Sequence, residues 1–211
     1  MLELFNNEVL PIWLAGGKLM IPLALLGLLI YLALFELHFY LSKRDFYKRD
    51  PNKWGHWIDV PKEAMGELGS IIQYSQDEVR TAADIRDRFD EIRRAYLPKI
   101  RARIRFANIL IGAAPLTGLL GTVMGMLNTF VGLSVSTAGN TIDLVAGGIS
   151  EALITTQTGL VLAIPAYVIV SNLRKRAEEL STFLIRLETL TVLRFQRRAN
   201  LSKKSREPVS A

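Results

Sequence analysis

The segment Gly118–Phe130, GLLGTVMGMLNTF, decides the fold, because it lies in a long run without charge and yet contains several Gly and Thr residues. Small and hydroxyl-bearing residues recur here at spacings of three and four, which places them along one stripe of a helix. The stripe consists of Gly118, Thr122, Gly125, Thr129, Gly132 and Ser136. The sequence therefore predicts a helix with one small, hydroxyl-bearing face and one oily face.

Three apolar stretches are long enough to cross a membrane. Leu19–Phe35 has no polar break, Phe106–Ile142 has no charge, and Leu144–Leu173 has only Glu151. A span needs about 20 mostly apolar residues. The 211-residue chain is therefore expected to be an all-α integral membrane protein with three transmembrane helices.

The basic residues predict the orientation. Lys18 precedes the first span, fifteen Lys and Arg lie between Lys43 and Arg105, none lies between the second and third spans, and ten follow Leu173. This asymmetry indicates an outside N-terminus and an inside C-terminus. It also explains the net charge of +6 without a nucleic-acid partner, since the charge marks the cytoplasmic side and its anionic lipid.

The expected organisation follows from these boundaries. It is a periplasmic N-terminal segment (1–17), a first span (18–41), a cytoplasmic helical region (42–105), a second span (106–138), a periplasmic turn (139–143), a third span (144–172), a cytoplasmic helix (173–200) and a disordered tail (201–211). The first segment has an apolar stripe that suits a short interfacial helix, although a frayed terminus is nearly as good an interpretation.

The cytoplasmic parts carry no enzyme motif, and we expect no cofactor or metal. Trp54 and Trp57 suit the headgroup level, and the isolated His38 and His56 are interpreted as structural. After the third span, apolar residues at heptad-like spacing predict a helix that packs against like helices. They are Leu173, Ala177, Leu180, Leu184, Leu187 and Thr191.

Small faces let transmembrane helices approach closely, within one subunit or between several. The third span has a stripe that matches the second. Across both spans the residues expected to pack helices are Gly118, Gly125, Gly132, Gly148 and Gly159.

Packing alone does not explain Glu151, because a charged carboxylate in a span costs about 3 kcal/mol or more. It lies eight residues past Asp143, about 12 Å along the helix, which is deep for a boundary charge. Counted from the inner basic boundary, Thr122 and Thr156 share a level in antiparallel spans, about 26 Å from Arg105 and Arg174. A Thr hydroxyl carries no charge, so these residues can line a polar path but require an acid from a partner.

Two segments carry a family resemblance: APLTGLLGTVMGMLNTF at residues 114–130 and ISEALITTQTGLVLAIPA at residues 149–166. They resemble the paired membrane motifs of the ExbB/TolQ/MotA proton-channel family, and the three-span layout is similar to ExbB and TolQ. The resemblance implies a homopentameric ring around two transmembrane helices of a single-span ExbD/TolR-like partner, whose Asp takes up and releases protons. It also implies motor work in the periplasm through a TonB- or TolA-like protein, such as TonB-dependent transport across the outer membrane.

By the same resemblance, the ion path or lumen would include Thr122, Thr156, Glu151 and Thr155, in a multi-pass protein of the bacterial inner membrane. Because Thr155 and Gln157 make this region more polar, a Na⁺-driven variant remains open. The alternative is a non-conducting membrane scaffold assembled through small-residue faces. A secondary transporter ranks third, because the sequence has no internal repeat.

Overall fold

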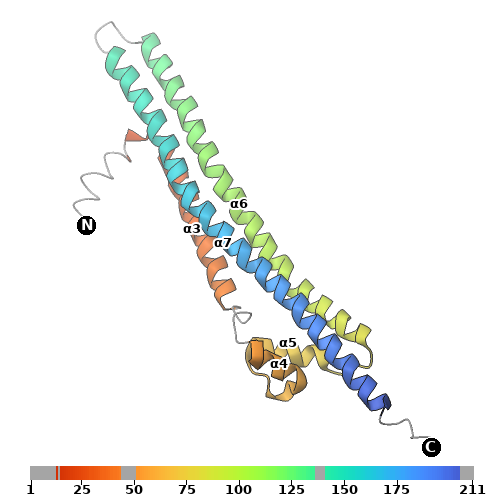
Figure 1. Ribbon diagram of the computed structural model, residues 1–211. Coiled ribbons are helices and arrows are strands. Elements are labelled where there is room, and N and C mark those ends of the chain that lie inside the picture. The colour runs from red at the N-terminus through yellow and green to blue at the C-terminus, as the bar shows by residue number, and fades with distance from the viewer. Residues whose placement is uncertain (1–12, 14, 44–50, 136–140, 205–211) are drawn as a thin grey trace, which may run out of the picture. The chain divides into compact units, whose positions relative to one another are not determined.

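The computed structural model describes residues 13, 15–43, 51–135 and 141–204. The N-terminal segment, the outer turn and the tail lie wholly or partly outside these described residues. The described part is helical, in the order α3 (Met20–Ser42), α4 (Pro51–Asp59), the 3-10 turn η3 (Pro61–Glu63), α5 (Gly66–Gln76), α6 (Ala82–Val135) and α7 (Thr141–Lys204) (Figure 1).

Three of these helices are long and apolar enough to cross a membrane. They are α3, α6 over Ala82–Ser134 and α7 over Ile142–Leu201. This confirms the all-α class and the three apolar helices. The sidedness of the spans stays a prediction.

The chain divides into two compact units, which are described separately. The first unit comprises Met1–Glu36 and Ile104–Asn172, and the second comprises Leu37–Arg103 and Leu173–Ala211. Helix α6 continues through Pro98 and Pro115, and α7 continues through Pro165. The kink that proline can impose at residue 98 therefore does not interrupt α6.

The second unit has a closed apolar core drawn from all its helices. Its buried side chains include Ile58, Leu68, Ile72, Ile85, Phe89, Leu180, Leu184 and Leu187. The whole heptad-like stripe from Leu173 to Thr191 is buried within the chain. The prediction that this stripe packs against like helices is therefore wrong, because the chain's own side chains already cover it.

The position of Trp54 also differs from the predicted one at the level of the lipid headgroups. Its side chain is only 5% exposed, and its ring meets Phe183 edge-on at 5.6 Å between centroids. Arg186 lies over the same ring. Trp54 therefore anchors α4 to α7, because an indole buries a large apolar area when it finds a protein partner.

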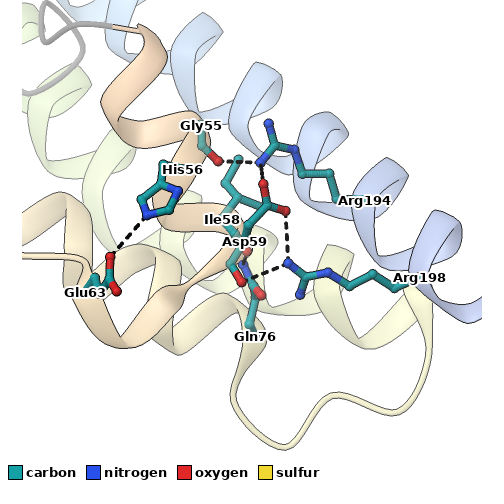
Figure 2. Close-up of polar contacts among 8 residues, drawn as sticks. All are labelled: Gly55, His56, Ile58, Asp59, Glu63, Gln76, Arg194 and Arg198. Carbon is teal, nitrogen blue, oxygen red and sulfur yellow. Dashed lines mark hydrogen bonds and ion pairs between the residues drawn. The ribbon is translucent and has the colours of Figure 1, made fainter.

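Two arginines of α7 hold the carboxyl end of α4 (Figure 2). Arg194 donates to the backbone oxygen of Gly55 and to the carboxylate of Asp59. Arg198 donates to the backbone oxygen and the carboxylate of Asp59, both over 2.9 Å. The last carbonyls of a helix have no partner within it, so these guanidinium groups satisfy groups that α4 cannot.

The start of α6 is defined by Thr81 and Asp84. The Thr81 hydroxyl accepts from the N–H of Asp84, and the Asp84 carboxylate accepts from the N–H of Thr81 and of Arg80. This is a capping box with Asp in the acidic position, and it satisfies donors that the first helical turn leaves free. The backbone N–H groups of Arg80 and Thr81 lower the pKa of Asp84 below its ordinary value.

Candidate ion-path face

In the first unit, α6 and α7 pack antiparallel along a seam of glycines. A β-carbon on Gly118 would lie 2.9 Å from the backbone oxygen of Thr155, and one on Gly125 would lie 2.8 Å from that of Gly148. Further along the seam, a β-carbon on Gly159 would lie 2.7 Å from the backbone oxygen of Ala114. Larger residues would push the two backbones apart, so these glycines permit the close approach that membrane helices use to associate.

The seam also depends on Gly121, which the stripe analysis missed. A β-carbon there would collide with the Thr155 side chain. The sequence does contain the pattern, because Gly118, Gly121 and Gly125 are also three and four residues apart and therefore share one side of a helix. Gly132 is less constrained than predicted, because its β-carbon would make only ordinary contact, at 3.6 Å, with Leu144.

The two adjacent threonines of α7 have different surroundings. Thr155 is 1% exposed and donates to the backbone oxygen of Ala152 over 3.0 Å. Its side chain fills the space over Gly121, so within this chain it packs α6 against α7. Its place on the ion path stays a prediction. Thr156 is half-buried and donates across the seam to the backbone oxygen of Gly118 over 3.1 Å.

Thr122 is also half-buried, and its hydroxyl donates to the backbone oxygen of Leu119 over 2.7 Å. Since Thr156 bonds to Gly118, one turn from Thr122, the shared level predicted by counting holds to within about one helical turn. Both hydroxyl protons are donated to carbonyls, which leaves the oxygens able to accept.

An apolar groove of about 380 Å³ lies between α6 and α7. It is lined by Asn108, Ile111, Gly112, Pro115, Leu160, Ala163, Ile164, Tyr167 and Val168. Thr122 is seven residues from Pro115, and Thr156 is four residues from Leu160, spacings that repeat the same side of a helix. Thr122, Thr156 and the groove residues therefore share one edge of the seam, named here the groove edge.

Helix α3 covers a different side of α7. A β-carbon on Gly27 would lie 3.0 Å from the Leu162 side chain, and the Tyr31 hydroxyl donates to the backbone oxygen of Leu162 over 3.4 Å. Glu151 precedes Leu162 by eleven residues, or about three turns, and lies on this same side.

The Glu151 carboxylate lies over Gly17, three residues before α3 begins. Its level is thus that of the entrance to the first apolar helix. The carboxylate is therefore not isolated, as counting along α7 alone suggested, and its depth in the membrane stays a prediction. The structure brings Thr122 and Thr156 together on the groove edge and places Glu151 on the side that faces α3.

Comparison with known proteins identifies the family. The model of the MotA/TolQ/ExbB proton channel family matches residues 64–184, more than half of the chain. The chain belongs to this proton channel family. The matched residues include the seam, the groove edge and Glu151, whereas α3 and Gly17 lie outside the match.

Individual proteins similar to this chain carry ExbB and TolQ names. A putative biopolymer transport protein, ExbB-like 1, from Synechocystis is 29% identical over 77% of this chain and 69% of its own length. The biopolymer transport protein ExbB of Pseudomonas putida is 52% identical over 26% of this chain and 17% of its own length. The Tol-Pal system protein TolQ of Pseudomonas aeruginosa is 40% identical over 39% of this chain and 35% of its own length. The match thus covers about two thirds of the Synechocystis protein and much less of the Pseudomonas ExbB and TolQ proteins.

Proposed function

We propose that this chain is a ring subunit of an ion-driven motor in the bacterial inner membrane, with its N-terminus in the periplasm. In this proposal, several copies surround a single-span partner of the ExbD/TolR type. The proton motive force acts through an Asp of that partner and drives work in the periplasm, such as TonB-dependent transport. Membership of the proton channel family and the three apolar helices support the proposal.

The observation that carries it is the pairing of two hydroxyls on one edge of the seam. Thr122 and Thr156 come from different helices, both are half-buried, and both continue the line of the groove. The groove lining is mostly apolar, apart from Asn108 and Tyr167, and the two threonine hydroxyls lie further along the same helix faces. A carboxylic acid that approaches along this edge would find two acceptors.

The chemistry of the path follows from what threonine can and cannot do. Its hydroxyl does not titrate at ordinary pH, so it cannot store the transported proton. Because each hydroxyl proton is already donated to a carbonyl, each oxygen is free to accept from a protonated acid or from water. The proposed role of the two threonines is to hold a protonated partner carboxyl, which releases its proton when it leaves the groove edge. Hydroxyl and carbonyl oxygens also suit Na⁺, so the identity of the ion is part of the test.

The stoichiometry rests on the family alone. We propose five copies and a TonB- or TolA-like client. The small-residue seam supports only the close packing of α6 and α7 within one chain, so contacts between copies must use other surfaces. This also weakens the alternative of a scaffold assembled through these small faces, because the seam already covers most of them.

The experiment is the double substitution Thr122→Val, Thr156→Val in the full chain, expressed with its partner. Valine keeps the shape of threonine and removes the oxygen. One membrane hydrogen bond is worth about 0.6 kcal/mol, so the complex should still assemble. Loss of ion-driven work in an assembled complex is the expected result.

Thr158→Val is the matched control. Thr158 also donates to a carbonyl of its own helix, that of Ile154, over 2.8 Å. It lies four residues before Leu162, on the side that faces α3. The control should retain full work. Full work in the double variant would end the proposal, and equal loss in the control would show that any hydroxyl removed from α7 has the same effect.

A further inference from the structure

The Glu151 side chain occupies the space that a β-carbon on Gly17 would take, at a glycine turn before α3. A β-carbon on Gly17 would collide with Glu151 Oε1 and would lie 2.6 Å from its Cδ and 3.1 Å from its Cγ. Gly17 also has a φ of +67°, in the left-handed region that favours glycine. Two independent features therefore require a glycine at this position, and one of them is the carboxylate itself.

Further contacts extend this approach along α7. A β-carbon on Gly16 would lie 3.0 Å from the Ile154 side chain, and one on Gly27 would lie 3.0 Å from that of Leu162. Glu151, Ile154 and Leu162 recur at spacings of three and eight, which repeat one side of a helix. We name this side the α3 edge of α7. Glycines therefore lie opposite both ends of the α3 edge: Gly17 opposite Glu151, and Gly27 opposite Leu162.

The α3 edge is separate from the groove edge. Thr156 follows Glu151 by five residues, a rotation of about 140° around the helix. On α7 the Glu151 side chain therefore points toward the entrance of α3, and Thr156 points toward the seam and the groove.

We propose that Glu151 is a positioning residue that fixes the axial register of α3 against α7 by seating its carboxylate on the Gly16–Gly17 turn. An acid suits this seat because the N–H groups that precede a helix have no partner within it, and a carboxylate only accepts hydrogen bonds. The turn itself is closed by a bond of 3.2 Å from the N–H of Met20 to the oxygen of Gly17. This role goes beyond the proposed motor function and holds whether or not the chain conducts ions.

The register can be measured directly, because the chain contains no cysteine. Gly27→Cys and Leu162→Cys together place two thiols where α3 meets α7, and the shorter side chain at 162 leaves room for the new β-carbon. The full chain is expressed with its partner, and membranes are oxidised with copper phenanthroline. The yield of the intrachain cross-link then reports the register, independently of ion-driven work.

Three variants are made in this background. Glu151→Ala removes the contact and should lose most of the cross-link. Gly17→Ala introduces the colliding β-carbon and should lose it as well. Glu151→Gln keeps the shape and an acceptor oxygen, so it should retain the cross-link.

Gly66→Ala is the matched control for backbone strain. Gly66 has a φ of +75°, similar to that of Gly17, but a β-carbon there would meet nothing within 4 Å. It should leave the cross-link unchanged.

Four results would overturn the proposal: an unchanged cross-link in Glu151→Ala, an unchanged cross-link in Gly17→Ala, an equal loss in Gly66→Ala, or a loss in Glu151→Gln as large as that in Glu151→Ala. If the wild-type chain drives no work, the cross-link still decides the positioning role, so the two proposals fail separately.

Discussion

The Thr129 side chain lies so close to Gly148 that a β-carbon at 148 would collide with its hydroxyl oxygen. Thr129 is buried, and its hydroxyl donates to the backbone oxygen of Gly125 over 2.9 Å. This contact closes the seam near the ends of α6 and α7 that lead to residues 136–140.

The first prediction concerns this contact. Gly148→Ala should weaken the seam, because Thr129 is held by its own hydrogen bond and cannot move without losing it. Overpacking of this kind costs about 1–3 kcal/mol. Unfolding of the purified chain in mixed micelles should register the loss. Gly132→Ala is the control, since its β-carbon meets Leu144 at an ordinary 3.6 Å, and a loss of equal size there would contradict the seam as described.

The second prediction concerns the attachment of α4. Trp54→Ala should release α4 from α7 more fully than Asp59→Asn. Removing a buried aromatic costs about 3–5 kcal/mol. An ion pair with exposed partners is worth about 1 kcal/mol or less, and the side chains of Asp59, Arg194 and Arg198 are 45%, 35% and 53% exposed. Hydrogen exchange over residues 51–59 measures the release.

The salt dependence of that release provides a check. Raising the ionic strength should screen the Asp59 pairs and leave the packing of Trp54 unchanged. The ranking would be contradicted by an Asp59→Asn variant in which α4 exchanges faster than it does in Trp54→Ala.

The third prediction concerns pH at the start of α6. Because the folded pKa of Asp84 is lowered, its contribution is present above its ordinary pKa of 3.8 and is lost as pH falls through the lowered folded value. The amide hydrogens of Arg80 and Thr81, corrected for intrinsic rates, should therefore exchange faster in strong acid. In Asp84→Asn this pH-dependent part should disappear. An unchanged acid response in that variant would assign the effect to another group.

The fourth prediction is the orientation, which rests on the basic residues alone. Reporter fusions at residues 60 and 205 should read cytoplasmic, and a fusion at residue 140 should read periplasmic. A cytoplasmic signal at residue 140 would contradict the three-span topology.

The sequence predicts the helices well because apolar length is a property of each segment by itself. It predicts much less about which side of a helix meets which partner. Thr155 and Thr156 are neighbours about 100° apart, so only the position of α6 separates the buried residue from the half-buried one. The stripe after Leu173 likewise has a buried face in any arrangement, and periodicity cannot tell a partner in the same chain from one in another copy.

The same limit explains Trp54 and Glu151. An indole near a span and an acid inside one are typical of an interface and of an ion path, respectively, but both side chains found their partners in segments distant in sequence. Trp54 meets Phe183, and Glu151 meets Gly17. Glycine turns and aromatic partners are common in any sequence, so neither pair could have been chosen before the chain was folded.

The prolines give the seam an uneven stiffness. Pro115 has no N–H to donate to the oxygen of Ile111, and Pro165 has none for the oxygen of Val161, so each helix lacks one backbone hydrogen bond within the seam. Gly159 lies against Ala114, which puts the two missing hydrogen bonds within about two turns of each other along the seam. Both fall on the stretch that lines the groove. A bending force applied to α6 and α7 will therefore be absorbed mainly beside the groove, while the glycine-packed part of the seam next to Thr122 and Thr156 moves as a stiff rod.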